Sequence, residues 1–194
     1  MKKIMFNDQY GLTQAVLDGR KTQTRRIAYE KPFKYNCNSG ICTEGKDKGK
    51  LIINDGYEIV AKSTYKIGEI VAVAQRYNYI PLTDDIFIGA GFSRGWLNKM
   101  FVKPSLMPHQ IKITSIRWER LQDISTDDCM REGIFCSHIE GIDDAYSYDA
   151  TNDSFEKKWW YRTPIEAYKM LSCKLHLHWD SNPLVFVYDF ELVK

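Results

Sequence analysis

Apolar residues at helical spacing mark the first helix of the chain. Asn7 or Asp8 is a suitable N-cap, because a side-chain oxygen there accepts a hydrogen bond from a free backbone N–H. Gly19 follows as a stop signal, so the pattern predicts a helix over about 8–18, after a short strand at 4–6. Three apolar side chains share one face of this helix: Leu12, Ala15 and Val16.

Five further segments have the short apolar or alternating pattern of β-strands. The turn sequence Asn54-Asp55-Gly56 separates two of them, which is typical of a β-hairpin. A long apolar run closes the sequence. The predicted strands are 51–53, 57–60, 70–74, about 111–121 and 184–192.

Two later helices begin with capping signals. Ser125 opens the first of them, and Gly133 ends it. Thr163, followed by Pro164 in the first turn, opens the second, which runs to about Lys174. Helices therefore alternate with strands along the second half of the chain.

The remaining segments are polar or rich in glycine. Residues 35–66 predict an inserted β-hairpin with a long loop, and 137–157 predict a polar acidic loop. Residues 81–109 predict a loop with one helical turn near 96–100. Strands at both ends with helices between them favour an α+β fold over a doubly wound sheet, and specifically a small mixed β-barrel with flanking helices. We expect a single domain over 1–194.

Composition narrows the class of protein. The chain has 194 residues, of which 44% are hydrophobic and 27% are charged, which excludes disorder over the whole chain. No stretch approaches the roughly 20 apolar residues of a membrane span, so no membrane partner is expected. The N-terminus lacks the apolar region and the cleavage site of a signal peptide, which indicates a cytoplasmic protein.

Charge is distributed unevenly along the chain. Residues 1–50 carry 11 basic and 5 acidic side chains, a balance of +6. Residues 122–156 carry 10 acidic side chains and one basic side chain, a balance of −9. This pattern allows a local anion site near the N-terminus. It lacks the broad basic footprint of a protein that binds double-stranded DNA, so duplex DNA is not an expected partner.

Two pairs of side chains suggest a metal site. Cys37 and Cys42 have the spacing of half a zinc site, yet no second Cys or His pair completes it. His176 and His178 would face the same way on a strand and share a metal; alternatively they lie in a helix-to-strand connection as incidental imidazoles. We expect reduced thiols, no metal and no cofactor.

The densest chemistry lies in the basic run 19–26, Gly-Arg-Lys-Thr-Gln-Thr-Arg-Arg. If this run is extended, Lys21, Gln23 and Arg25 share one face. A tight turn at Lys21 would instead bring its side chain beside Thr24. Lysine, arginine and hydroxyl groups so close together suit an anionic or carbonyl-bearing ligand, and the alternative is an exposed, solvated turn.

The spacing Gly19-x-Lys21-x-x-Thr24-x-Arg26 resembles the signature of the ASCH family. Four later segments resemble family segments in the same order, and the match is closest to the larger, phage-associated members. The resemblance implies a PUA-like β-barrel with flanking helices. The four segments are the Lys-x-Gly-Glu turn and strand at 66–73, the Arg-Trp-Glu-Arg-Leu-Gln-Asp-Ile-Ser run at 117–125, the helix at 127–134 and the closing Trp-Asp-Ser-Asn-Pro strand at 179–187.

The resemblance also implies candidate site residues. One small bacterial member of the family is a 4-acetylcytidine amidohydrolase whose activity is attributed to a lysine, a threonine and a glutamate. By motif these match Lys21, Thr24 and Glu132, which would supply a base, a nucleophile and a proton carrier. Where many larger members have an Arg-Glu pair, this chain has Gln and Arg. The expected ligand-binding residues are Arg20, Arg25, Arg26 and Gln75.

Three functions remain open from the sequence. The first is recognition of RNA or a modified nucleoside, with amide hydrolysis of an acylated cytidine as the candidate reaction. The second is a non-catalytic RNA-binding module, which the positive balance of the first 50 residues fits. The third is a phage-derived protein that acts through protein contacts. Phosphate contacts would make RNA affinity fall steeply with salt, whereas nucleoside binding would show little salt dependence.

Overall fold

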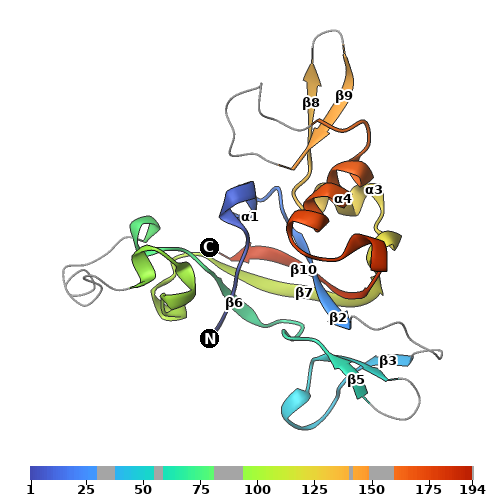
Figure 1. Cartoon of the computed structure of the whole chain (residues 1–194). Coiled ribbons are helices and arrows are strands. Elements are labelled where there is room, and N and C mark those ends of the chain that lie inside the picture. Colours follow the sequence, from blue (N-terminus) through green and yellow to red (C-terminus); the bar gives the residue numbers. More distant parts are fainter. Residues whose placement is uncertain (30–37, 55–58, 81–93, 140–141, 149–159, 194) are drawn as a thin grey trace.

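The computed structural model describes the chain except for residues 30–37, 55–58, 81–93, 140–141, 149–159 and 194. Its centre is a five-stranded sheet with the order β1-β6-β7-β10-β2 (Figure 1). Only β1 and β6 run parallel; the other neighbours are antiparallel. The strands are β1 (Lys2–Ile4), β2 (Gln23–Tyr29), β6 (Ile70–Val73), β7 (Gln110–Arg120) and β10 (Leu184–Val193).

The two longest strands form the middle of this sheet. β10 pairs with β7 over its whole length and with β2 on its other side. Residues 184–188 of β10 are all buried, because the strand is covered on both faces and both edges. The uninterrupted apolar run at 184–192 is the sequence pattern of such a central strand. The strands predicted at 70–74, 111–121 and 184–192 are therefore confirmed.

The fold is mixed α+β, as predicted, but the described strands do not close into a barrel. β1 and β2 are the two edges of an open sheet. β1 pairs over only three residues, and the chain between the two edges crosses one face of the sheet through α1 (Leu12–Leu17) (Figure 1). No ladder therefore joins the edges within the described residues, and the PUA-like barrel is not confirmed.

The first helix is shorter than the sequence predicts. Gly11, with φ of +65°, divides the predicted segment into a 3₁₀ turn, η1 (Asp8–Tyr10), and α1. Asn7 caps η1 by accepting from the backbone N–H of Gln9. Gly19 then adopts φ of +73° and ends the segment, as predicted.

The other two helices begin where their capping signals predict. Ser125 accepts from the backbone N–H of Asp128 and opens α3 (Thr126–Arg131), and Gly133 follows with φ of +104°. Thr163 accepts from the backbone N–H of Glu166 and opens α4 (Pro164–Lys174). In Figure 1, α1, α3 and α4 lie above the central sheet.

The inserted segment forms a small antiparallel sheet with the order β3-β4-β5 below the central sheet (Figure 1). The hairpin of β4 (Leu51–Asn54) and β5 (Ile59–Lys62) is confirmed, and its turn lies outside the described residues. β3 (Asn38–Ile41) and the 3₁₀ turn η2 (Gly45–Asp47) occupy a segment predicted as loop. All four residues of β3 are exposed, so the sequence has no apolar pattern that would predict this strand.

The predicted acidic loop at 137–157 is wrong over its first half. β8 (Phe135–Ile139) and β9 (Ile142–Ser147) form a hairpin there, and 149–159 lie outside the described residues. Backbone hydrogen bonds join Tyr146 to Tyr161, just before α4. The buried side chains of β9 include the small residues Ala145 and Ser147, which give little hydrophobic signal.

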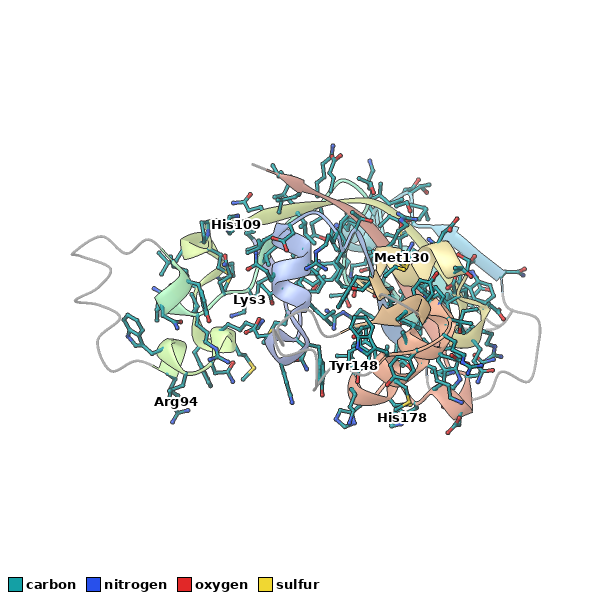
Figure 2. All side chains as sticks on the ribbon, turned by 90° about the horizontal axis from the view of Figure 1, so that it is seen from above. Lys3, Arg94, His109, Met130, Tyr148 and His178 are labelled. Atoms are coloured by element: carbon teal, nitrogen blue, oxygen red, sulfur yellow. The ribbon has the colours of Figure 1, made fainter. Side chains whose placement is uncertain are left out.

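The single helical turn predicted near 96–100 is a series of short 3₁₀ turns. They lie to one side of α1, and the segment with His178 lies on the other side (Figure 2). Lys3 joins the turns to β1 by donating to the backbone carbonyls of Met100 and Val102. The turns are η3 (Tyr77–Tyr79), η4 (Arg94–Trp96), η5 (Lys99–Phe101) and η6 (Pro104–Leu106); two others elsewhere are η7 (Leu121–Asp123) and η9 (Trp179–Ser181).

Across the described residues, every helix is too short or too polar to span a membrane.

Substitutions of two leucines, one buried and one exposed, test the position of the hydrophobic core. Leu121 is 0% exposed in the main core, whereas Leu97 is 81% exposed on a surface turn. Leu121→Ala should lower the free energy of unfolding by about 2–5 kcal/mol, because it leaves a cavity. Leu97→Ala should change it by less than about 0.5 kcal/mol. Urea unfolding of both variants measures the difference, and equal losses would contradict this core.

Candidate functional site

The basic run of the sequence is exposed at Gly19 and Arg20 and then enters the interior. Lys21, Gln23, Thr24 and Arg25 are all buried, so the exposed, solvated alternative does not hold for this part of the run. Backbone hydrogen bonds hold the run in place: Lys21 donates to the carbonyl of Ala15 in α1, and the next residue donates to the end of α3. The run therefore passes between two helix ends before it becomes edge strand β2.

Lys21 and Glu132 form a buried ion pair. The distance from Lys21 Nζ to Glu132 Oε2 is 2.5 Å, and each side chain is less than 5% exposed. Lys21 Nζ also donates to the Glu132 carbonyl oxygen at 2.6 Å. Glu132 directly follows α3, so the helix cap at Ser125 and the turn at Gly133 set its position.

Arg25 shares the carboxylate of Glu132. Its Nη1 donates to Glu132 Oε1 at 3.0 Å, and its Nε and Nη2 donate to one oxygen of Glu119 at 2.9 and 2.6 Å. Nη2 also reaches Asp128 at 2.9 Å. Burial opposes the charge of Arg25, but Glu132 and the other anionic partners hold its pKa above the ordinary value. The guanidinium of Arg25 is therefore fully paired within the protein.

An outer ring of charges surrounds Arg25. Arg117 donates to Asp128 at 2.5 Å and to Asp189 at 3.2 Å, and Arg131 donates to Asp189 at 2.6 Å. Gln23 bridges the same two aspartates. With Lys21, Arg25, Glu119 and Glu132, the network holds four cations and four anions. We call these eight charged residues the ion network.

The pKa of Lys21 is lower than the ordinary value of 10.5. Burial is the main cause, because it disfavours the charged ammonium form; Glu132 opposes the shift, and Arg26 and Arg25 add to it. The ammonium is thus easier to deprotonate than that of a surface lysine. A lysine in this state suits proton transfer.

Thr24 and Lys21 line the same small cavity. The cavity, which we call the inner cavity, has a volume of about 70 Å³ and is also lined by Phe6, Arg26 and Glu132. Within the described residues the Thr24 hydroxyl has no hydrogen-bond partner. A space of this size holds about two water-sized groups, far below the roughly 300 Å³ of a typical ligand pocket.

A larger cleft adjoins the inner cavity. This main cleft has a volume of about 550 Å³ and shares Phe6 and Arg26 with the inner cavity. Arg26 donates to the Met5 carbonyl at 2.5 Å. Lys99 also lines the cleft, and it donates to Asp8 at 2.6 Å. The main cleft therefore offers room for a nucleoside-sized ligand beside the inner cavity.

A second cleft, the side cleft, has a volume of about 410 Å³. Its lining includes Arg20, Gln75, Arg76 and the exposed ring of Tyr79. Arg20 lies 3.1 Å from Asp18, so it is paired at the surface. The structure thus places Arg20 and Gln75 away from the inner cavity, in a neighbouring cleft.

Sequence reasoning missed two cations of these clefts. Arg76 lines both the main and the side cleft, and Lys99 lines the main cleft. Arg76 directly follows Gln75, at the point where the chain has Gln and Arg in place of the Arg-Glu pair of the ASCH family that it resembles. This departure is the sequence signal that could have identified Arg76. Lys99 lies between glycine-rich and proline-rich stretches without periodicity, and no sequence signal marks it.

The histidine pair does not lie on a strand. His176 and His178 are in the connection between α4 and η9, with φ of 56° and 52°. The prediction of two imidazoles on one strand face is therefore wrong, and the connection alternative is confirmed. Cys42 is half-buried, and Cys37 lies outside the described residues. In the part of the chain that the structure describes, no three metal-ligating side chains come together.

Comparisons with protein-family models, with curated proteins and with solved structures found no match to this chain. The likeness to the ASCH family therefore rests on the motifs in the sequence, and the function rests on the site.

The ion network predicts a loss of stability in acid. Burial would raise the pKa of Asp189, but hydrogen bonds from Ser115 and Gln23 and the charges of Arg131 and Arg117 outweigh it, and the pKa lies below 3.8. In the unfolded chain the pKa of this carboxyl returns to its ordinary, higher value, so the unfolded state binds the proton more tightly than the folded state. The free energy of unfolding should therefore fall as the pH drops below about 3.8.

Asp189→Asn should be less stable than the wild type at neutral pH and should show a shallower pH dependence in acid. The two curves should converge at low pH, as measured by urea unfolding. Asp127→Asn, at an exposed position of α3, is the control and should parallel the wild type. Parallel curves for Asp189→Asn would contradict the assigned role of Asp189.

Proposed function

We propose that this chain is an ASCH-like protein of the PUA-like class that recognises a modified pyrimidine nucleoside and hydrolyses its N4-acyl amide. One observation carries the proposal: the Thr24 hydroxyl, which has no hydrogen-bond partner among the described residues, lines a small cavity beside the buried pair of Lys21 and Glu132. These three side chains supply the nucleophile, base and proton carrier that amide hydrolysis needs. The volumes of the two spaces support this function, since an acyl group fits the inner cavity and a nucleoside fits the main cleft.

The reaction begins with transfer of a proton from the Lys21 ammonium to Glu132, which is 2.5 Å away. The neutral amine takes the proton of the Thr24 hydroxyl as Oγ1 attacks the acyl carbonyl carbon. The oxyanion lies near the Arg26 guanidinium, which stabilises the negative charge. Lys21 returns the proton to the departing N4 nitrogen, and the C–N bond breaks.

An acyl ester on Thr24 then remains in the cavity. Water, activated by the same Lys21 amine, attacks this ester and releases the free acid. The net reaction consumes one water and gives the amine and the acid, and Thr24 recovers its proton. Because the inner cavity holds only about 70 Å³, short acyl groups are the expected substrates.

RNA binding without catalysis is the second candidate function. It is favoured by Arg26 and Arg76, which line the main cleft and have no carboxylate partner among the described residues. If this function is correct, the protein leaves acylated nucleosides intact, and its affinity for RNA falls steeply as salt rises.

The direct test is deacetylation of N4-acetylcytidine, followed by its ultraviolet absorbance. Thr24→Val should lower kcat by at least about 10³-fold, because the nucleophile is lost. Glu132→Gln should also lower kcat, and its folding is checked by circular dichroism because Glu132 supports Arg25. Thr22→Val is the matched control, since Thr22 lies outside the lining of the inner cavity. No turnover by the wild type, or full activity of Thr24→Val, would overturn this function.

A further inference from the structure

Two adjacent residues of the side cleft have buried polar atoms without partners. Gln75 is 7% exposed, and its Oε1 is buried with no hydrogen bond; the buried Nε of Arg76 likewise has none. Leaving a buried donor or acceptor unpaired is unfavourable, so such atoms are rare in folded proteins. Both residues line the side cleft, which brings one unpaired acceptor and one unpaired donor close to the same space.

The charges around the side cleft leave Arg76 as its unbalanced group. Arg20 pairs with Asp18, and Asp8 pairs with Lys99. Within the described part of the chain, no carboxylate lies within ion-pair distance of Arg76. The cleft therefore has one cation in excess, which suits a ligand with a negative charge. A guanidinium binds phosphate or carboxylate oxygens with paired N–H donors.

Arg76 also connects the side cleft to the proposed reaction site. It lines both the side and the main cleft, and the main cleft shares Arg26 with the inner cavity. A ligand that extends from Thr24 through the main cleft would thus reach Arg76. The main cleft alone, at about 550 Å³, is within the range of clefts that hold compounds of nucleotide size.

We propose that Arg76 binds the phosphate of a pyrimidine nucleotide and that Gln75 Oε1 accepts a hydrogen bond from its ribose. This inference rests on the proposed function and deepens it, because it makes a nucleotide the preferred ligand over the free nucleoside. A nucleotide carries the two complementary groups within one small molecule: a hydroxyl donor for Gln75 and an anion for Arg76.

The test is calorimetric binding of cytidine 5′-monophosphate, cytidine and inorganic phosphate to the full chain. The wild type should bind the monophosphate at least about tenfold more tightly than cytidine, because one charge-assisted contact is added. Arg76→Gln should reduce this preference to about twofold or less. The preference should also weaken as ionic strength rises.

Arg94→Gln is the matched control. Arg94 is an exposed arginine on the neighbouring turn and lines neither cleft (Figure 2). It should keep the preference for the monophosphate. Equal affinities for cytidine and its monophosphate, or an undiminished preference in Arg76→Gln, would overturn the inference. Inorganic phosphate that binds as tightly as the monophosphate would also overturn it, since the cleft would then be a site for free phosphate.

Binding does not depend on turnover, so the two proposals fail separately. An Arg76-dependent preference in a protein that leaves N4-acetylcytidine intact would refute hydrolysis and keep the phosphate site. Turnover of N4-acetylcytidine without any preference for the monophosphate would support hydrolysis and refute the phosphate site.

Discussion

The carboxylate of Glu132 accepts hydrogen bonds from both Lys21 and Arg25 in the interior of the protein. Removing one partner of such a buried pair leaves an uncompensated charge, which typically costs about 3–5 kcal/mol. The three residues come from separate elements: Glu132 directly follows α3, Lys21 follows the Gly19 turn after α1, and Arg25 lies in edge strand β2. The ion network thus fixes two helix ends against the central sheet and defines one wall of the inner cavity.

The N-terminal segment around Phe6 and Asp8 connects this structural core to the clefts. Phe6 lines the inner cavity and the main cleft, and Asp8 lines the main and the side cleft. Lys99 donates to the Phe6 carbonyl at 2.5 Å and to Asp8, which holds the segment against the 3₁₀ turns. The segment around Phe6 and Asp8 therefore borders all three spaces: the inner cavity with Thr24, the main cleft and the side cleft with Arg76.

The sequence predicts the elements of this fold better than their contacts. Ser125, Thr163 and Gly19 carry local signals, and the structure confirms the helix boundaries that they predict. Burial of Arg25 is not visible locally, because its partners Glu119, Asp128 and Glu132 lie about a hundred residues away. Strand β9 was missed for a different reason: its buried side chains include small and polar ones, so alternation of hydrophobicity is absent. Lys21 and Arg25 both contact Glu132, and this tertiary contact has no signal in the local sequence.

A crystal structure of Thr24→Val bound to N4-acetylcytidine 5′-monophosphate tests the central claim most directly, because this variant cannot form the acyl ester. The account predicts the acetyl group in the inner cavity beside Lys21, the base in the main cleft, the ribose beside Gln75 and the phosphate on Arg76. Electron density for the nucleotide elsewhere on the molecule, with the inner cavity and both clefts unchanged, would contradict it.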